Sequence, residues 1–125
     1  MVRFIGLILF FLICASFVLF EEDYTACLVK YDSRWGAECV QCKVSDNSYR
    51  VSLRNTCRDT IDVKCAVQEA DKRWKTFIKL QLGPNDTMVA YACEGRGKYL
   101  YWARLAGDVS TPFPTDDEIN AQYNK

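Results

Sequence analysis

The sequence contains no histidine. This absence excludes the Ser–His and Cys–His nucleophile pairs, the usual ligand sets of zinc hydrolases and the commonest general base. Paired carboxylates remain open as catalytic groups, as in glycoside hydrolysis. The acidic residues available for such a pair are Glu38, Asp62, Glu69, Asp71 and Glu94, and none of them stands out. We therefore expect a non-enzymatic protein without cofactor or metal, and a small enzyme with paired carboxylates is the alternative.

The chain also lacks an excess of charge, since it has 16 basic and 16 acidic residues. Loss of an N-terminal leader containing Arg3 would leave a formal charge of −1. A balanced chain produces no long-range field that attracts nucleic acids or anionic membranes. We expect no nucleic-acid partner.

Residues 4–20 form a nearly unbroken apolar run of 17 residues, preceded by Arg3 and followed by three acidic residues at 21–23. This pattern predicts a secretory signal peptide over residues 1–20. An uncleaved membrane anchor is an alternative, because the run is at the lower limit of what spans a bilayer. Lipidation of Cys14 is a third alternative, disfavoured by Ile13 before it. Residues 21–125 then form one secreted or extracellular domain, periplasmic or at the cell surface in a bacterium.

An even number of cysteines follows this leader, which predicts disulfide bonds rather than a metal site. The six are Cys27, Cys39, Cys42, Cys57, Cys65 and Cys93, and their pairing is left open. Cys39 and Cys42 form a Cys-x-x-Cys motif, but within a strand they point to opposite faces and lie too far apart to bond. We expect three disulfides, with different partners for Cys39 and Cys42.

Alternation of apolar and polar residues predicts short β-strands along the whole domain. The predicted strands cover residues 26–31, 37–44, 49–54, 61–67, 73–82, 87–93 and 98–105. Their number and spacing favour a small antiparallel β-sandwich, or a partly open barrel, stabilised by disulfides. Residues 115–118 form a capping box that opens a short C-terminal helix, and Ile119 and Tyr123 can pack this helix onto a sheet.

The strands at 49–54 and 61–67 are central to this fold. A two-residue turn between them would place Leu53 opposite Lys64, whereas a three-residue turn pairs Leu53 with Cys65 and keeps the apolar faces together. A crossover to a second sheet is the alternative and buries the same faces, while Asp62 and Lys64 lie on the opposite side. A second hairpin is predicted for residues 87–93 and 98–105, with glycines at the bend.

The last predicted strand has apolar side chains on both faces and basic residues beside them. Aromatic and basic side chains together are typical of surfaces that bind sugars, bases or proteins. The candidate ligand-binding residues are Trp74, Arg96, Lys98, Tyr99, Tyr101, Trp102 and Arg104. The same rings could instead fill the core of a small sandwich.

These observations predict a secreted binding module for an extracellular protein or glycan. A structural surface protein is the alternative if the apolar N-terminus is retained, which is also the condition for membrane contact. Asn85 begins an Asn-Asp-Thr acceptor pattern in a predicted turn, so it is a glycosylation site in a eukaryotic host. The ligand and the oligomeric state remain open.

Overall fold

The computed structural model describes residues 23–36, 42 and 46–124. The predicted signal peptide lies outside the described residues, as does nearly all of the strand predicted at 37–44.

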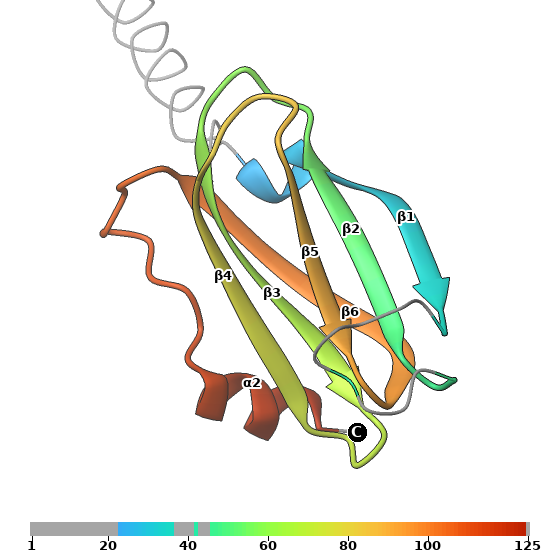
Figure 1. The fold of residues 1–125 in the computed structure, drawn as a ribbon. Coiled ribbons are helices and arrows are strands. Elements are labelled where there is room, and N and C mark those ends of the chain that lie inside the picture. Colours follow the sequence, from blue (N-terminus) through green and yellow to red (C-terminus); the bar gives the residue numbers. More distant parts are fainter. Residues whose placement is uncertain (1–22, 37–41, 43–45, 125) are drawn as a thin grey trace, which may run out of the picture.

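Two antiparallel sheets of three strands each form the described part of the domain (Figure 1). One sheet has the order β1-β2-β5 and the other β4-β3-β6. The elements are η1 (Tyr24–Cys27), β1 (Leu28–Trp35), β2 (Tyr49–Asn55), β3 (Ile61–Glu69), β4 (Trp74–Leu82), β5 (Thr87–Ala92), β6 (Gly95–Leu105) and α2 (Asp116–Tyr123). The sheets are not closed into a barrel. The predicted all-β sandwich with a short C-terminal helix is confirmed.

The chain crosses between the sheets after β2, β4 and β5. The crossover alternative for β2 and β3 is therefore confirmed, and the three-residue hairpin with Leu53 opposite Cys65 is not formed. The predicted hairpin of β5 and β6 is wrong, because β5 pairs with β2 and β6 pairs with β3. A crossover stacks the apolar face of one strand against that of the next, whereas a hairpin would place both faces side by side in one sheet.

The inward faces of β2 and β3 form the centre of the core. Val51 and Leu53 from β2 are buried, as are Val63, Cys65 and Val67 from β3. Burying one such aliphatic side chain stabilises the fold by about 1.5–3 kcal/mol. These are the faces that the alternating pattern predicted to be apolar.

Within the described residues, two disulfides connect segments far apart in the sequence. Cys27 bonds to Cys57 and Cys42 bonds to Cys93, across 30 and 51 residues respectively. Disulfides are typical of oxidising compartments. The prediction of separate partners for Cys39 and Cys42 is met for Cys42, whereas Cys39 lies outside the described residues.

Cys65 does not take part in a disulfide, and this corrects the prediction that it would. Its thiol is free and fully buried. Its neighbours across the sheet are Phe77 and Tyr101 rather than another cysteine. Burial raises the pKa of the thiol to about 12, so the unreactive thiol form dominates at neutral pH.

The outer face of β3 is also buried, which the alternating pattern did not predict. Asp62 and Lys64 lie on this face and are only 2% and 5% exposed. The C-terminal segment, residues 106–123, covers them. Lys64 Nζ contacts the Asp116 carboxylate at 2.8 Å and donates to the Pro114 carbonyl at 2.8 Å. Charged side chains thus anchor the C-terminal segment to the sheet.

The helix α2 begins and packs as its sequence predicts. Thr115 is the N-cap, and its hydroxyl accepts a hydrogen bond from the Glu118 amide at 3.2 Å. Ile119 is fully buried in a second small apolar cluster with Ala66 and Trp74. The ring of Tyr123 lies 6.2 Å from that of Trp102. Strand β6 therefore packs on the main core on one side and on the helix on the other, which explains its two apolar faces.

Candidate functional site

The predicted binding residues of β6 divide between its two faces. Tyr99 and Tyr101 are half-buried, pack against the main core and have stacked rings with centroids 6.1 Å apart. Burial raises the pKa of Tyr99. Trp102 belongs instead to the cluster beneath α2. The structure therefore does not bring all of the predicted aromatic residues to one surface.

Arg104 is engaged inside the molecule. Its Nε contacts the Asp62 carboxylate at 3.2 Å, and its Nη1 donates to the Thr111 carbonyl at 3.0 Å. Its guanidinium lies 4.5 Å from the centre of the Phe113 ring. These contacts hold the C-terminal segment against the sheet, so Arg104 is occupied by the fold. Arg96, by contrast, is exposed.

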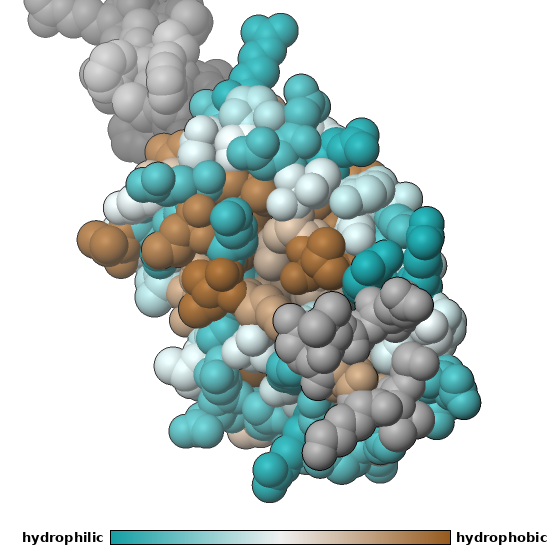
Figure 2. All heavy atoms as spheres, in the orientation of Figure 1, coloured by the Kyte–Doolittle hydropathy of each residue, from teal (hydrophilic) through white to brown (hydrophobic). Residues whose placement is uncertain are grey.

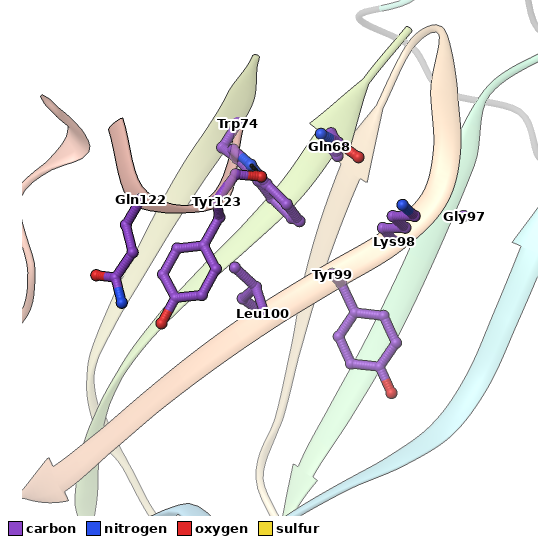
Figure 3. Close-up of a pocket in the computed structure, with 8 residues that line it drawn as sticks. All are labelled: Gln68, Trp74, Gly97, Lys98, Tyr99, Leu100, Gln122 and Tyr123. Carbon is purple, nitrogen blue, oxygen red and sulfur yellow. Dashed lines mark hydrogen bonds between the residues drawn. The ribbon is translucent and has the colours of Figure 1, made fainter. Parts of the chain in front are cut away.

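A groove of about 720 Å³ opens between the first half of β6, the start of β4 and the end of α2 (Figure 3). This volume lies in the range of small-molecule sites. Its lining residues are Gln68, Trp74, Gly97, Lys98, Tyr99, Leu100, Gln122 and Tyr123. Three of the predicted residues border this groove, namely Trp74, Lys98 and Tyr99. The ring of Tyr99, however, points to the other side of β6 from Leu100.

Trp74 is held in the wall of this groove by hydrogen bonds to the C-terminal segment. Its backbone amide donates to the Asn120 side chain at 2.8 Å, and its indole Nε1 donates to the Tyr123 carbonyl at 3.1 Å. Trp74 as a whole is only 8% exposed. The aromatic wall of the groove is thus held rigidly before any ligand arrives.

Gln68 lies beneath the groove beside a β-bulge. It pairs with Trp74 on β4, and the ladder from β3 to β6 changes register between Val67 and Glu69. The Gln68 side chain is fully buried, and its Nε2 donates to the Lys72 carbonyl at 3.2 Å. Its Oε1 is the buried side-chain atom of the described residues that has no hydrogen-bond partner. An unsatisfied buried acceptor costs about 1–3 kcal/mol.

Sequence reasoning missed five lining residues, namely Gln68, Gly97, Leu100, Gln122 and Tyr123. Tyr123 was predicted to pack the helix onto the sheet, which it does. The position of Gln68 depends on the bulge, and no residue in β3 signals a bulge. The groove depends on where α2 ends over the sheet, which only the tertiary structure determines.

Comparison with protein families, curated proteins and solved structures finds no match. The site must therefore be interpreted from its own chemistry.

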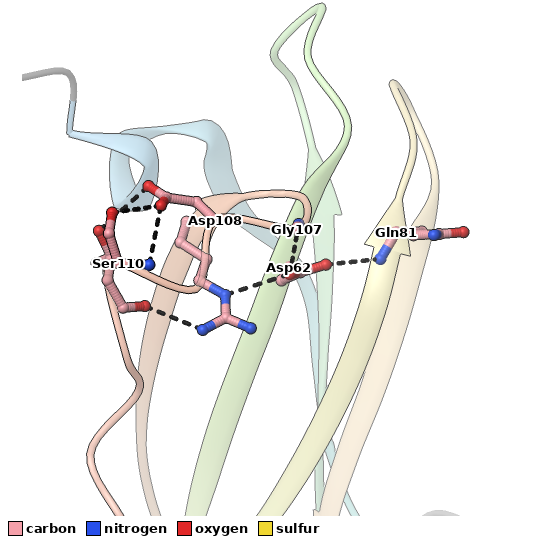
Figure 4. A network of polar contacts seen from close by, with 7 residues as sticks. Asp62, Gln81, Gly107, Asp108 and Ser110 are labelled. Carbon is pink, nitrogen blue, oxygen red and sulfur yellow. Dashed lines mark hydrogen bonds and ion pairs between the residues drawn. The ribbon is translucent and has the colours of Figure 1, made fainter.

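The acidic residues nominated for catalysis include one that is committed to the fold. The Asp62 carboxylate accepts hydrogen bonds from Arg104 and from the backbone amides of Gln81 and Gly107 (Figure 4). Burial alone would raise the pKa of Asp62, but these hydrogen bonds outweigh burial and hold the pKa below its ordinary value. Glu38 lies outside the described residues. Within the described residues, no group of three or more acidic or cysteine side chains could hold a metal ion.

The pKa of Asp62 predicts that the free energy of unfolding decreases in acid. A lowered pKa means that this stabilisation is complete above the unfolded-state pKa, about 3.9, and is lost as the pH falls through the lower folded-state pKa. Urea denaturation between about pH 2 and pH 6 measures the loss. Asp62→Asn should show a shallower decrease below about pH 4, and an unchanged decrease would contradict the assignment to Asp62.

Exposed apolar residues also lie on the surface outside the groove. Hydrophobic side chains gather over the face formed by β4 and β5 (Figure 2), where Ile78, Leu80 and Val89 are exposed. Asn85 is exposed in the turn between these strands, with a φ of 64°. The acceptor pattern thus lies in an accessible turn, and its modification stays a prediction.

Among the described residues, no helix is long and apolar enough to cross a membrane.

Proposed function

We propose that this protein is a secreted, non-enzymatic module that binds an extracellular glycan or protein in the groove between β6, β4 and α2. The observation that carries the proposal is the groove itself, in which a rigid aromatic wall and exposed polar side chains lie together. Binding sites of this kind combine apolar walls with a few well-placed polar groups. The two disulfides support a location in an oxidising compartment.

The basic part of the predicted surface is reduced to one lining residue. Lys98 is exposed and brings the single formal charge among the eight lining residues. Arg104 is committed to Asp62, so it contributes stability rather than contact. The proposal therefore assigns recognition to Lys98, Leu100, Gln122 and Tyr123, with Trp74 behind them.

The proposal is tested by probing arrays of glycans and of purified extracellular proteins with the tagged protein. We expect at least one probe to bind, and the charge reversal Lys98→Glu to weaken that binding at least tenfold. Lys79→Glu is the matched control, because Lys79 is also exposed but lies on β4 and does not line the groove. Circular dichroism should show that both variants are folded. Absence of binding, or equal binding by both variants, would contradict the proposal.

A further inference from the structure

The polar residues on the outer face of β3 differ in how they are satisfied. Asp62 accepts from Gly107 and Arg104, and Lys64 contacts Asp116 and Pro114. Gln68 is the next polar residue on the same face, and it lines the groove beside the end of α2. Its Oε1 receives no donor from the C-terminal segment. The groove therefore begins where the C-terminal segment no longer covers β3.

The orientation of the Gln68 amide is determined by its surroundings. Its Nε2 donates to the Lys72 carbonyl at 3.2 Å. A flipped amide would place two carbonyl oxygens against each other, so Oε1 remains the atom that needs a donor. Figure 3 shows this amide between Trp74 and Lys98. A ligand that satisfies it must supply a hydroxyl or an N–H group.

The other lining residues narrow the class of ligand. Leu100, Tyr123 and the edge of Trp74 offer apolar contact, and Gln122 adds an exposed amide. Lys98 favours a negatively charged group. A ring with an apolar face, several hydroxyls and one anionic substituent combines all of these properties.

We propose that the groove binds an anionic sugar unit of a glycan, an inference that rests on the proposed function. The carboxylate or sulfate of the sugar pairs with Lys98, one hydroxyl donates to Gln68 Oε1, and the ring lies against Tyr123 and Leu100. Because this oxygen is closed to solvent in the structure, binding includes a movement of the side chains that cover it.

The test compares sugars that differ in one group. Glucuronic acid and glucose share the same ring, and glucose 6-sulfate replaces the carboxylate by a sulfate ester. In an NMR titration of the full chain, we expect the Trp74 indole N–H resonance to shift with at least one anionic sugar at tenfold lower concentration than with glucose. Lys98→Gln should abolish this difference, whereas Lys79→Gln should preserve it. A preference for only one of the two anionic sugars identifies the group recognised.

The variant Gln68→Met distinguishes binding from folding. It removes the unpartnered acceptor together with the hydrogen bond from Nε2 to the Lys72 carbonyl, and it keeps the length of the side chain, so thermal stability should change little. Binding of the anionic sugar should weaken about tenfold. Lower stability with unchanged binding would overturn the role of Gln68.

The failure of this inference is distinct from that of the proposed function. If no sugar shifts Trp74 while an extracellular protein binds in a Lys98-dependent manner, the sugar class is wrong and the binding module stands. Equal affinity for glucose and glucuronic acid also overturns the anionic class. If no probe of either kind binds, both proposals fail.

Discussion

Replacement of Asp62 by alanine is expected to lower the free energy of unfolding by about 3–5 kcal/mol. The carboxylate connects three parts of the chain, because it accepts from the Gln81 amide at 3.0 Å, the Gly107 amide at 3.1 Å and the Arg104 guanidinium at 3.2 Å. Its removal leaves the amides of Gln81 and Gly107, which bond to it in a partly buried setting, and a largely buried Arg104 without their acceptor. Urea denaturation followed by circular dichroism measures the loss.

Asp108→Ala is the matched control for this experiment. Asp108 lies in the same region (Figure 4), but its carboxylate accepts only from the nearby Ser110 and Thr111 within its own loop. Hydrogen bonds from Ser110 are the main cause that holds the pKa of Asp108 below its ordinary value. We expect this replacement to have a much smaller effect than Asp62→Ala. Similar losses for the two variants would show that Asp62 does not anchor the C-terminal segment.

Loss of the disulfide between Cys42 and Cys93 is expected to lower the free energy of unfolding by about 4 kcal/mol. The bond joins residues 51 apart in sequence, so its removal releases considerable chain entropy in the unfolded state. The bond between Cys27 and Cys57, across 30 residues, should contribute slightly less. Loss of both would remove a large part of the net stability typical of a small domain. Double alanine variants measured by urea denaturation test each bond.

Cys65→Ala separates the effect of a crosslink from that of a lost sulfur atom. Cys65 is buried and forms no disulfide, so its replacement should cost only about 1 kcal/mol through reduced packing. The native thiol should resist alkylation, because it is buried and its pKa is raised to about 12. Intact mass after alkylation in denaturant counts the free thiols. Alkylation of Cys42 or Cys93 without reductant would contradict the crosslink between them.

Most strand positions could be predicted from the alternation of apolar and polar residues, although the strand predicted at 26–31 lies at 28–35, after η1. Residues 49–54 and 61–67 fall within β2 and β3, and the capping box marks the start of α2. The pairing of strands could not be predicted in the same way. A hairpin and a crossover bury the same side chains, so the pattern in β5 and β6 contains no information on which sheet each joins.

The candidate site was predictable only in part for a related reason. Alternation shows which residues share a face, but not what covers that face. Lys64 is polar and resembles a solvent-exposed strand residue, yet it is buried by Pro114 and Asp116, about 50 residues later in the sequence. Arg104 likewise resembles a ligand-binding residue in the sequence, because the alternation does not show that Asp62 and Thr111 occupy its side chain. Trp74 and Lys98 were predicted and do border the groove. Another wall of the groove comes from α2, and the strand pattern contains no information on it.

The cover over β3 also affects the order in which the protein can fold during its synthesis. The six strands of the described residues leave the ribosome before α2 (Asp116–Tyr123) does. Until that helix emerges, Lys64 lacks Asp116 and Ala66 is not covered by Ile119. The sandwich can pair its strands at that stage, but one face of its central strand stays open to water. Native packing is therefore completed late, when the helix reaches the sheet.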